Sequence, residues 1–358
     1  MTNDRRPDLL VTTPIILGVL YDFPQGDGGA SFERSLHEGL AETSARRSRP
    51  VELRSLEVRG LPAGSAGAVE DGLRRLAADG VAAVVGPSIS DNAVVAAPVA
   101  DELGVACINY SGGERTRSDW MFHYQVGSLE EEPLLLANRM AERGFSRAAI
   151  LFDESVVGRR YEECFRAACA RHGLTVVESR PVPSLATDLT PDLDALRVHD
   201  PDVVVYLGLG VAARAVAVAL DAAGWAVPVL ANSALMFGYA RPEWRVGFAG
   251  WEYVDTVADD NRVRAMLASR LPRSGTGPIG CAAFDIGRLL GEALVRAEDG
   301  DRDAVHDALE SVKGLPAASG HDGTVLGFGA WDRGALKGHF LVLREWRDGR
   351  SRQVERPR

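Results

Sequence analysis

Polar and glycine-rich loops follow the predicted strands, and they hold most of the side chains that could do chemistry. In the first half of the chain they offer candidate ligand-binding residues: Tyr21, Asp22, Phe23, Ser88, Ser90, Tyr110, Ser111, Gly112 and Gly113. In the second half they offer Ser155, Gly210 and Ser233. Because ligands of open parallel sheets bind outside the carboxyl ends of the strands, these loops predict a site with contributions from both halves.

The loops at 86–92 and 109–113 suit a small anion or an amide. Ser90 offers a hydroxyl, the helix that starts nearby offers backbone N–H groups, and the glycine pair at 112–113 lets N–H groups point inward. Helix capping explains the polar residues at 90–92 equally well, and a plain turn explains the glycine pair equally well. The loops together are a stronger indication of binding than any one of them.

One segment has the pattern of a dinucleotide-binding turn. It begins at Gly208, ends at Ala213, follows a predicted strand and opens a predicted helix. The next strand, at 227–230, is followed by Ala231 and Asn232 and offers no acid for a ribose. A tight turn that requires small residues is the simpler interpretation, and an NAD(P)-dependent enzyme remains an alternative.

Other catalytic and metal-binding patterns are missing from the sequence. Ser88 and Ser111 do not complete a G-x-S-x-G motif, and His37 lacks a second histidine four residues on. The cysteines form no C-x-x-C pair, and the acidic run at 130–132 is typical of a solvated helix start. We therefore expect no catalytic residue, no metal and no cofactor.

The composition is that of an acidic globular protein of about two domains. The chain has 358 residues, and 40 Lys and Arg against 50 Asp and Glu give a formal charge of −10. Proteins that bind nucleic acid usually carry a basic face, and no basic cluster occurs before the tail, so we expect no nucleic-acid partner.

The sequence has no segment with the roughly 20 apolar residues of a membrane span, which predicts no direct membrane insertion. The apolar run at 15–20 is too short for a secretory signal. As written, the sequence predicts a cytoplasmic protein, whereas a truncated or mis-called start would make it extracytoplasmic.

Strand and helix patterns alternate along most of the chain. Continuous apolar runs such as 81–85 are typical of buried parallel strands. Two such series lie on either side of 122–126, which predicts two α/β lobes with right-handed crossovers. Near the end, 338–346 alternates like an antiparallel edge strand or hairpin, and the polar tail at 347–358 is expected to be frayed.

In the order and spacing of several segments, the chain resembles the type I periplasmic solute-binding proteins, specifically the branched-chain amino-acid binding family of ABC transporters. The resemblance covers 15–348 and rests on GVLYDFPQGDGG, VAAVVGPSISDNAVVAAPVADELGVACINYSGG, AAILFDESVVGRRY, PDVVVYLGLG, GPIGCAAFDIGRLLGEAL and FGAWDRGALKGHFLVLREW. It implies an α/β fold of two Rossmann-like lobes, with parallel sheets flanked by helices and a three-segment hinge.

The resemblance also implies where the lobes divide. The crossings are expected near Gln125, Tyr253 and Phe328. An N-terminal lobe would then comprise 1–125 plus 254–328, and a C-terminal lobe 126–253 plus 329–358.

For the ligand, the resemblance implies a carboxylate held by residues of the first lobe: Ser90, Ser111, Gly112 and Gly113. In the family a second-lobe acid commonly pairs with the ligand ammonium, but Ser233 stands there, and a hydroxyl residue often stands where Gly113 is. Both departures argue against an α-amino acid, unless Asp285 or Asp22 replaces the missing charge.

A small polar ligand is therefore expected: an amino acid, an amide or an aromatic carboxylate. The lobes would close on it, and the protein's partner would be an ABC permease or a regulatory protein. A protein-interaction module that has lost its ligand is a further alternative.

Overall fold

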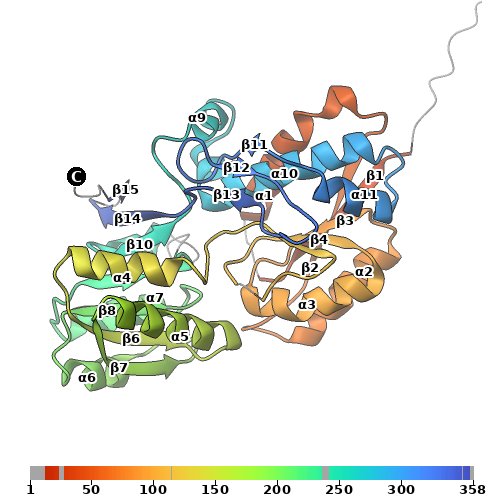
Figure 1. Ribbon diagram of the computed structural model, residues 1–358. Coiled ribbons are helices and arrows are strands. Elements are labelled where there is room, and N and C mark those ends of the chain that lie inside the picture. Colours follow the sequence, from red (N-terminus) through yellow and green to blue (C-terminus); the bar gives the residue numbers. More distant parts are fainter. Residues whose placement is uncertain (1–12, 24–27, 114, 236–241, 349, 355–358) are drawn as a thin grey trace, which may run out of the picture.

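The computed structural model describes residues 13–23, 28–113, 115–235, 242–348 and 350–354, and it has two α/β lobes (Figure 1). The first lobe is built on a parallel five-stranded sheet in the order β2-β1-β3-β4-β5. Its strands are β1 (Ile15–Tyr21), β2 (Val51–Glu57), β3 (Ala83–Val85), β4 (Ala106–Asn109) and β5 (Met121–His123).

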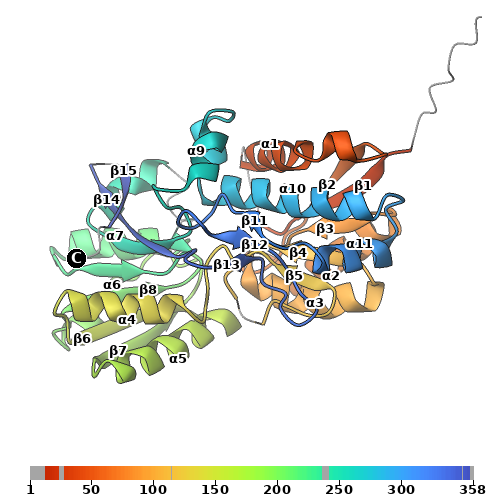
Figure 2. The ribbon, with the colours of Figure 1, turned by 45° about the horizontal axis from the view of Figure 1, so that its top comes forward.

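Helices cover both faces of this first sheet (Figure 2). One face packs against α2 (Ala66–Ala78) and α3 (Ser90–Leu103), through apolar side chains that include Leu73 and Ala96. The other face is covered by α1 (Gly28–Ala41), α10 (Pro278–Arg296) and α11 (Arg302–Glu310). Strand β3 is buried throughout, as its continuous apolar run predicts.

The helices α1 and α10 lie side by side, although they are far apart in the sequence (Figures 1 and 2). A Cβ atom at Gly39 would lie 2.0 Å from the carbonyl oxygen of Phe284, and one at Gly287 would lie 2.3 Å from that of Leu36. Glycine on both helices therefore lets the two backbones touch, and this contact builds α10 into the first lobe.

The second lobe is built on a seven-stranded sheet in the order β15-β14-β10-β9-β8-β6-β7. Strands β7, β6, β8, β9 and β10 run parallel to one another. Strand β14 pairs antiparallel with β10, and β15 pairs antiparallel with β14. These strands are β6 (Arg147–Asp153), β7 (Thr175–Val182), β8 (Val203–Leu207), β9 (Val229–Ala231), β10 (Glu252–Asp255), β14 (Val342–Arg347) and β15 (Arg350–Gln353).

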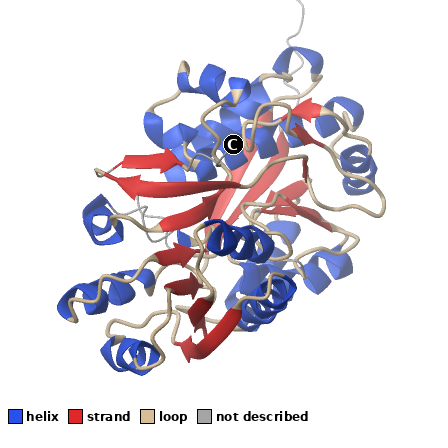
Figure 3. Cartoon of the chain, turned by 60° about the vertical axis from the view of Figure 1, so that its left-hand side comes forward, coloured by secondary structure: helices blue, strands red, loops and turns tan. Residues whose placement is uncertain are grey.

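Helices also cover both faces of the second sheet (Figure 3). On one face lie α4 (Glu132–Glu142) and α5 (Val156–Arg171), and on the other lie α6 (Thr190–Arg197) and α7 (Ala213–Ala222). The other helices of the described ranges are η1 (Ser44–Arg46), η2 (Pro242–Phe248), α9 (Arg262–Ala268) and η3 (Arg273–Thr276).

The end of the chain confirms one expectation and contradicts another. The alternating segment at 338–346 does contain an antiparallel strand, β14, but within the tail the residues Arg350–Gln353 form a strand, β15, rather than a frayed end. The physical reason is a set of side-chain contacts. The Ser351 hydroxyl lies 2.5 Å from that of Tyr253 and accepts a hydrogen bond from Arg344 Nε at 2.8 Å.

A third, antiparallel sheet of short strands connects the lobes. It is formed by β11 (Leu315–Pro316), β12 (Val325–Leu326) and β13 (Leu336–Lys337). Just before β13, Ala335 N donates to the carbonyl oxygen of His123 at 2.8 Å, so this segment still pairs with β5 of the first lobe.

Candidate functional site

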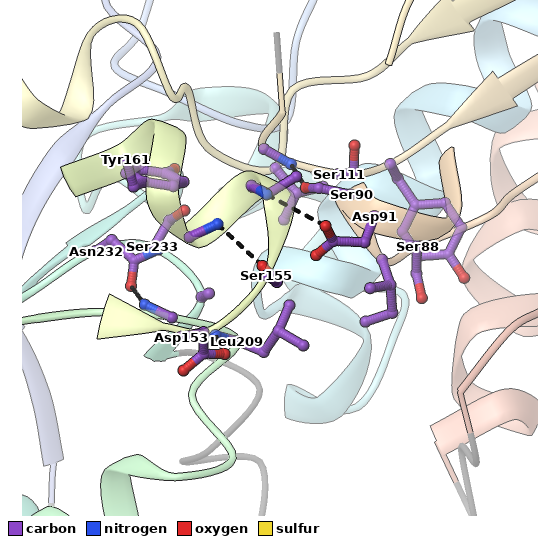
Figure 4. A pocket seen from close by; sticks show the side chains of 18 residues that line it. Ser88, Ser90, Asp91, Ser111, Asp153, Ser155, Tyr161, Leu209, Asn232 and Ser233 are labelled. Carbon is purple, nitrogen blue, oxygen red and sulfur yellow. Dashed lines mark hydrogen bonds between the residues drawn. The ribbon is translucent and has the colours of Figure 1, made fainter. Parts of the chain in front are cut away.

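The cleft between the lobes is lined by loops and helix starts that follow strands of both sheets (Figure 4). From the set predicted on sequence, the structure brings together Ser88, Ser90, Tyr110, Ser111, Gly112, Ser155 and Ser233. The free volume of the cleft is about 40 Å³, whereas a single water molecule needs roughly 10–15 Å³ on the same measure. The cleft of the described conformation is therefore narrow, and a larger ligand fits only when the lobes separate further.

Asp22 organises the first-lobe side of the cleft from behind. Its Oδ1 accepts hydrogen bonds from the Ser88 N–H at 2.8 Å and hydroxyl at 2.7 Å. Its Oδ2 accepts from Ile89 N at 2.9 Å and Asn92 Nδ2 at 2.8 Å. Asp22 is fully buried and does not line the cleft, so it holds the loop after β3 rather than facing a ligand.

The loop after β4 is held by a neutral histidine. The Arg117 Nε donates to His123 Nδ1 at 3.0 Å, so the ring proton is on Nε2, which donates to the Ser111 carbonyl oxygen at 2.6 Å. Burial lowers the pKa of His123 to about 3, which keeps the ring uncharged. The Ser111 hydroxyl donates to Asn109 Oδ1 at 2.8 Å, which fixes its orientation.

The glycines after β4 have different surroundings. Gly112 lines the cleft, and its N–H donates to Ser90 Oγ at 3.3 Å. Gly113 is not among the lining residues, and a Cβ atom there would lie 2.9 Å from Thr116 Cγ2. Packing against Thr116 explains why this position has no room for the hydroxyl residue that the family resemblance leads one to expect.

On the second-lobe side, Asp153 at the end of β6 lines the cleft. Its Oδ2 accepts from Leu209 N at 2.8 Å and its Oδ1 from the Tyr206 hydroxyl at 3.2 Å. Burial raises the pKa of Asp153 to about 6, and the negative charge of Asp91 contributes to that increase. The sequence analysis named Ser155, two residues on, and missed Asp153.

The turn at 208–213 is explained by this carboxylate. A Cβ atom at Gly208 would lie 2.2 Å from Asp153 Oδ1, and Gly210 adopts a φ of 81°. Gly208 is thus required by the nearby carboxylate and Gly210 by its positive φ. The Leu209 N–H is already bonded to Asp153. Gly210 itself does not line the cleft.

Glu132 is a buried carboxylate that the sequence analysis misjudged. The acidic run at 130–132 was expected to be solvated, but Glu132 is fully buried. Its Oε2 accepts from Ser233 N at 2.7 Å. Its Oε1 accepts from the hydroxyls of Ser233 at 2.7 Å and Tyr161 at 2.9 Å, and from Ser128 N at 2.6 Å. Burial raises the pKa of Glu132, and these bonds oppose the increase.

The position of Glu132 bears on the second-lobe acid that the family resemblance leads one to expect. A second-lobe acid was expected where Ser233 stands, and a carboxyl group from α4 lies directly behind that serine. No spacing rule in the sequence links 132 to 233, so the only available signal was the acidic residue at a helix start.

Hydrogen bonds to Asp91 join the lobes across the cleft. Asp91, in the first turn of α3, accepts from the Val157 N–H at the start of α5 at 3.2 Å (Figure 4). Ser155 caps α5 by accepting from Gly158 N at 3.0 Å. Burial raises the pKa of Asp91, while its bonds to the α5 start act in the opposite direction. The described conformation is therefore a closed one.

The remaining predicted residues lie outside the cleft lining. Tyr21 donates to Glu33 Oε1 at 3.1 Å, and Phe23 is half-buried. Asp285 on α10 is fully buried and accepts from Ala318 N at 2.9 Å and from the Tyr124 hydroxyl at 2.8 Å. Asp285 thus ties α10 to the connecting segments and does not replace the charge missing at Ser233.

The described residues include neither a cluster of metal-ligating side chains nor a membrane-spanning helix. Within these ranges no three His, Cys, Asp or Glu side chains are grouped so that they could hold a metal ion. The helices in the same ranges also include none that is both long and apolar enough to cross a bilayer.

The comparisons with known proteins agree with this architecture. A family model described as periplasmic binding protein matches residues 17–335. No curated protein matches the sequence.

Several solved structures share the fold. A leucine-binding protein of Thermotoga maritima is 16% identical with a TM-score of 0.79, over 95% of this chain and 98% of that one. An ABC-transporter solute-binding protein of R. palustris, in complex with 4-hydroxybenzoate, is 16% identical with a TM-score of 0.80, over 96% of each chain. A type 1 periplasmic binding protein of Bordetella pertussis Tohama I is 15% identical with a TM-score of 0.82, over 96% of this chain and 100% of that one. The expected fold class is confirmed.

Proposed function

The chain belongs to the periplasmic binding protein family, and from this premise we propose that it binds a small polar ligand in the cleft between its lobes. The candidates are an amino acid, an amide and an aromatic carboxylate. The lobes would close on the ligand, and the protein would act as the substrate-binding component of an ABC transporter or as a related sensor, without catalysis.

The observation that carries the proposal is the composition of the cleft wall. First-lobe residues such as Ser90 and Gly112 face second-lobe residues such as Asp153 and Ser233 around one enclosed space. A ligand in that space contacts both lobes only when they are closed, so its binding energy favours closure.

The family supports a site of action outside the cytoplasm and an ABC permease as partner. We also infer that the chain crosses between the lobes three times. Because 333–335 still pair with β5, we place the third crossing after Leu336 rather than near Phe328. We propose the first crossing near Gln125 and the second near Tyr253, as the resemblance implies.

The rival reading, an NAD(P)-dependent enzyme that uses the 208–213 turn, is disfavoured by Asp153. Its carboxylate already accepts the Leu209 N–H, and it would place a negative charge beside a pyrophosphate. A protein-interaction module that has lost its ligand is tested by the same experiment as the proposal.

The test is a thermal-shift screen against amino acids, amides, amines and aromatic acids, with NAD as a comparison. A ligand at about 100 times its Kd should stabilise the folded protein by about 2.7 kcal/mol, and small-angle scattering should then show compaction. A higher melting temperature with NAD alone would favour the enzyme. A folded protein whose melting temperature changes with none of the small molecules would contradict the binding role.

A further inference from the structure

The cleft is rich in carboxylates from both lobes. Asp91 and Asp153 line it, and Glu132 lies directly behind two lining hydroxyls. In the described part of the chain, no Lys, Arg or His is among the lining residues, and none of these three carboxylates has an ion pair. Buried charge without a countercharge is costly, so the arrangement calls for a positive partner.

The partners that these carboxylates do have are neutral. Asp153 accepts from a backbone N–H and a phenol, and Asp91 accepts from the Val157 N–H. Because burial and the neighbouring charge of Asp91 raise the pKa of Asp153 only to about 6, most of this carboxyl is ionised at neutral pH. Closure therefore brings negative charges of the two lobes together.

The hydroxyls in front of Glu132 extend its charge toward the cleft. Ser233 and Tyr161 both line the cleft, and both donate their hydroxyl hydrogen to Glu132 Oε1. Each hydroxyl can therefore offer only lone pairs to a ligand. This wall of the second lobe accepts hydrogen bonds and suits a group that donates several of them, such as an ammonium.

A separate observation also points to a molecule in the cleft. Tyr110 lines the cleft and is 2% exposed, yet its hydroxyl has no hydrogen-bond partner. A buried hydroxyl without a partner destabilises the folded protein, so a polar atom of a ligand is a suitable partner for it.

We propose that the ligand is an organic cation, whose ammonium or amidinium nitrogen lies among Asp91, Asp153 and the Tyr161 and Ser233 hydroxyls. This inference rests on the proposed function and narrows its ligand classes. It favours amines, amidines and amino-acid amides over compounds that bring a carboxylate of their own.

The test uses compounds of one shape and different charge, measured by calorimetry with the full chain. One series is leucinamide, leucine and 4-methylpentanoate, which are a cation, a zwitterion and an anion. A second pair is benzamidine and benzoate. We expect the cation to bind at least about tenfold more tightly than its partners in any series that binds, as charge-assisted hydrogen bonds imply.

The outcomes separate the two proposals. A carboxylate or zwitterion that binds as tightly as the matched cation would overturn the cation inference and leave the binding function standing. If no member of either series binds to folded protein, and the wider screen is equally silent, the binding function itself fails.

Variants of the acidic residues give an independent measurement. Asp153→Asn should weaken the best cation by roughly 10- to 100-fold and leave a neutral amide of the same shape nearly unchanged. The matched control is Glu154→Gln, because Glu154 is the exposed neighbour and makes only a 3.8 Å contact with Arg159. Equal losses in both variants, or none in Asp153→Asn, would contradict the inference. Asp91→Asn serves as a second variant if Asp153→Asn melts at a lower temperature without ligand.

Discussion

The buried carboxylates in this protein have different roles, and their hydrogen-bond partners show which role each one has. Asp22 is surrounded by four donors that belong to a single loop and helix start, so it builds the cleft wall. Asp285 joins α10 to the connecting segments, whereas Asp153 has a face on the cleft. Their chemical type is the same, and only their surroundings assign the roles.

Replacement of Asp22 tests its role as an anchor. In Asp22→Asn the amide nitrogen would face N–H donors, so we expect the free energy of unfolding to fall by about 2 kcal/mol and ligand affinity to fall with it. Urea denaturation measures the first effect. As a control, Asp79→Asn alters an exposed acid 3.7 Å from Arg54 and should stay within ~0.5 kcal/mol of the original protein.

The buried carboxyl of Asp285 leads to a prediction about how the free energy of unfolding depends on pH. Burial raises its pKa to about 7 in the folded protein, from the ordinary value of 3.8. The folded state therefore holds the proton more tightly, and the stability that this gives is present below about pH 4 and lost as pH rises to about 7. Compared with Asp285→Asn, the original protein should lose more unfolding free energy between pH 4 and 7. Parallel pH profiles of the two proteins would contradict the shifted pKa.

At the scale of elements, the contact between α1 and α10 depends on glycines, which let the two helix backbones touch. This close approach fixes α10, and with it the segment that leads toward the second lobe. The functional loops are set in the same way, because the Gly208 turn leaves room for the Asp153 carboxylate.

A pair of glycine substitutions tests the helix contact. Gly39→Ala would place a methyl group 2.0 Å from a carbonyl oxygen of α10, so the helices must separate at a cost of about 1–3 kcal/mol or more. Gly67→Ala is the matched control, since a Cβ atom there meets nothing within 4 Å and alanine favours the helix. We expect a lower melting temperature for the first variant and an equal or higher one for the second.

At the scale of the whole molecule, closure brings like charges together and is held by the hydrogen bond from Val157 to Asp91. The balance between these opposing effects determines how open the protein is without ligand. A countercharge from the ligand would shift that balance toward the closed form.

Removal of the cross-lobe contact should favour opening. Asp91→Ala, measured by small-angle scattering without ligand, is expected to have a larger radius of gyration than the original protein. Asp71→Ala, an exposed acid of the same lobe, should leave that radius unchanged. If Asp91 contributed only charge repulsion between the lobes, its replacement would instead give a more compact protein.

The sequence predicted the fold well because periodicity and loop order are local properties. Two lobes, a parallel first sheet and the antiparallel segment near the end could all be read from alternating patterns. Part of the candidate cleft lining, including Ser90, Gly112 and Ser155, followed from the rule that ligands bind at the carboxyl ends of strands. Glu132 was missed because its meaning comes from Ser233 and Tyr161, which only the packing of α4 against α5 brings near. Asp153 was passed over because a carboxyl at a strand end also suits a surface loop.

The hairpin of β14 and β15 also has a consequence for how the protein is made. It forms the edge of the second sheet beside β10, although α10 and α11 of the first lobe come between them in the chain. While the polypeptide leaves the ribosome, β10 must wait with its outer edge unpaired until the first-lobe helices have emerged. An unpaired strand edge is prone to association with other chains, so the edge of β10 is open to such association until β14 has been made.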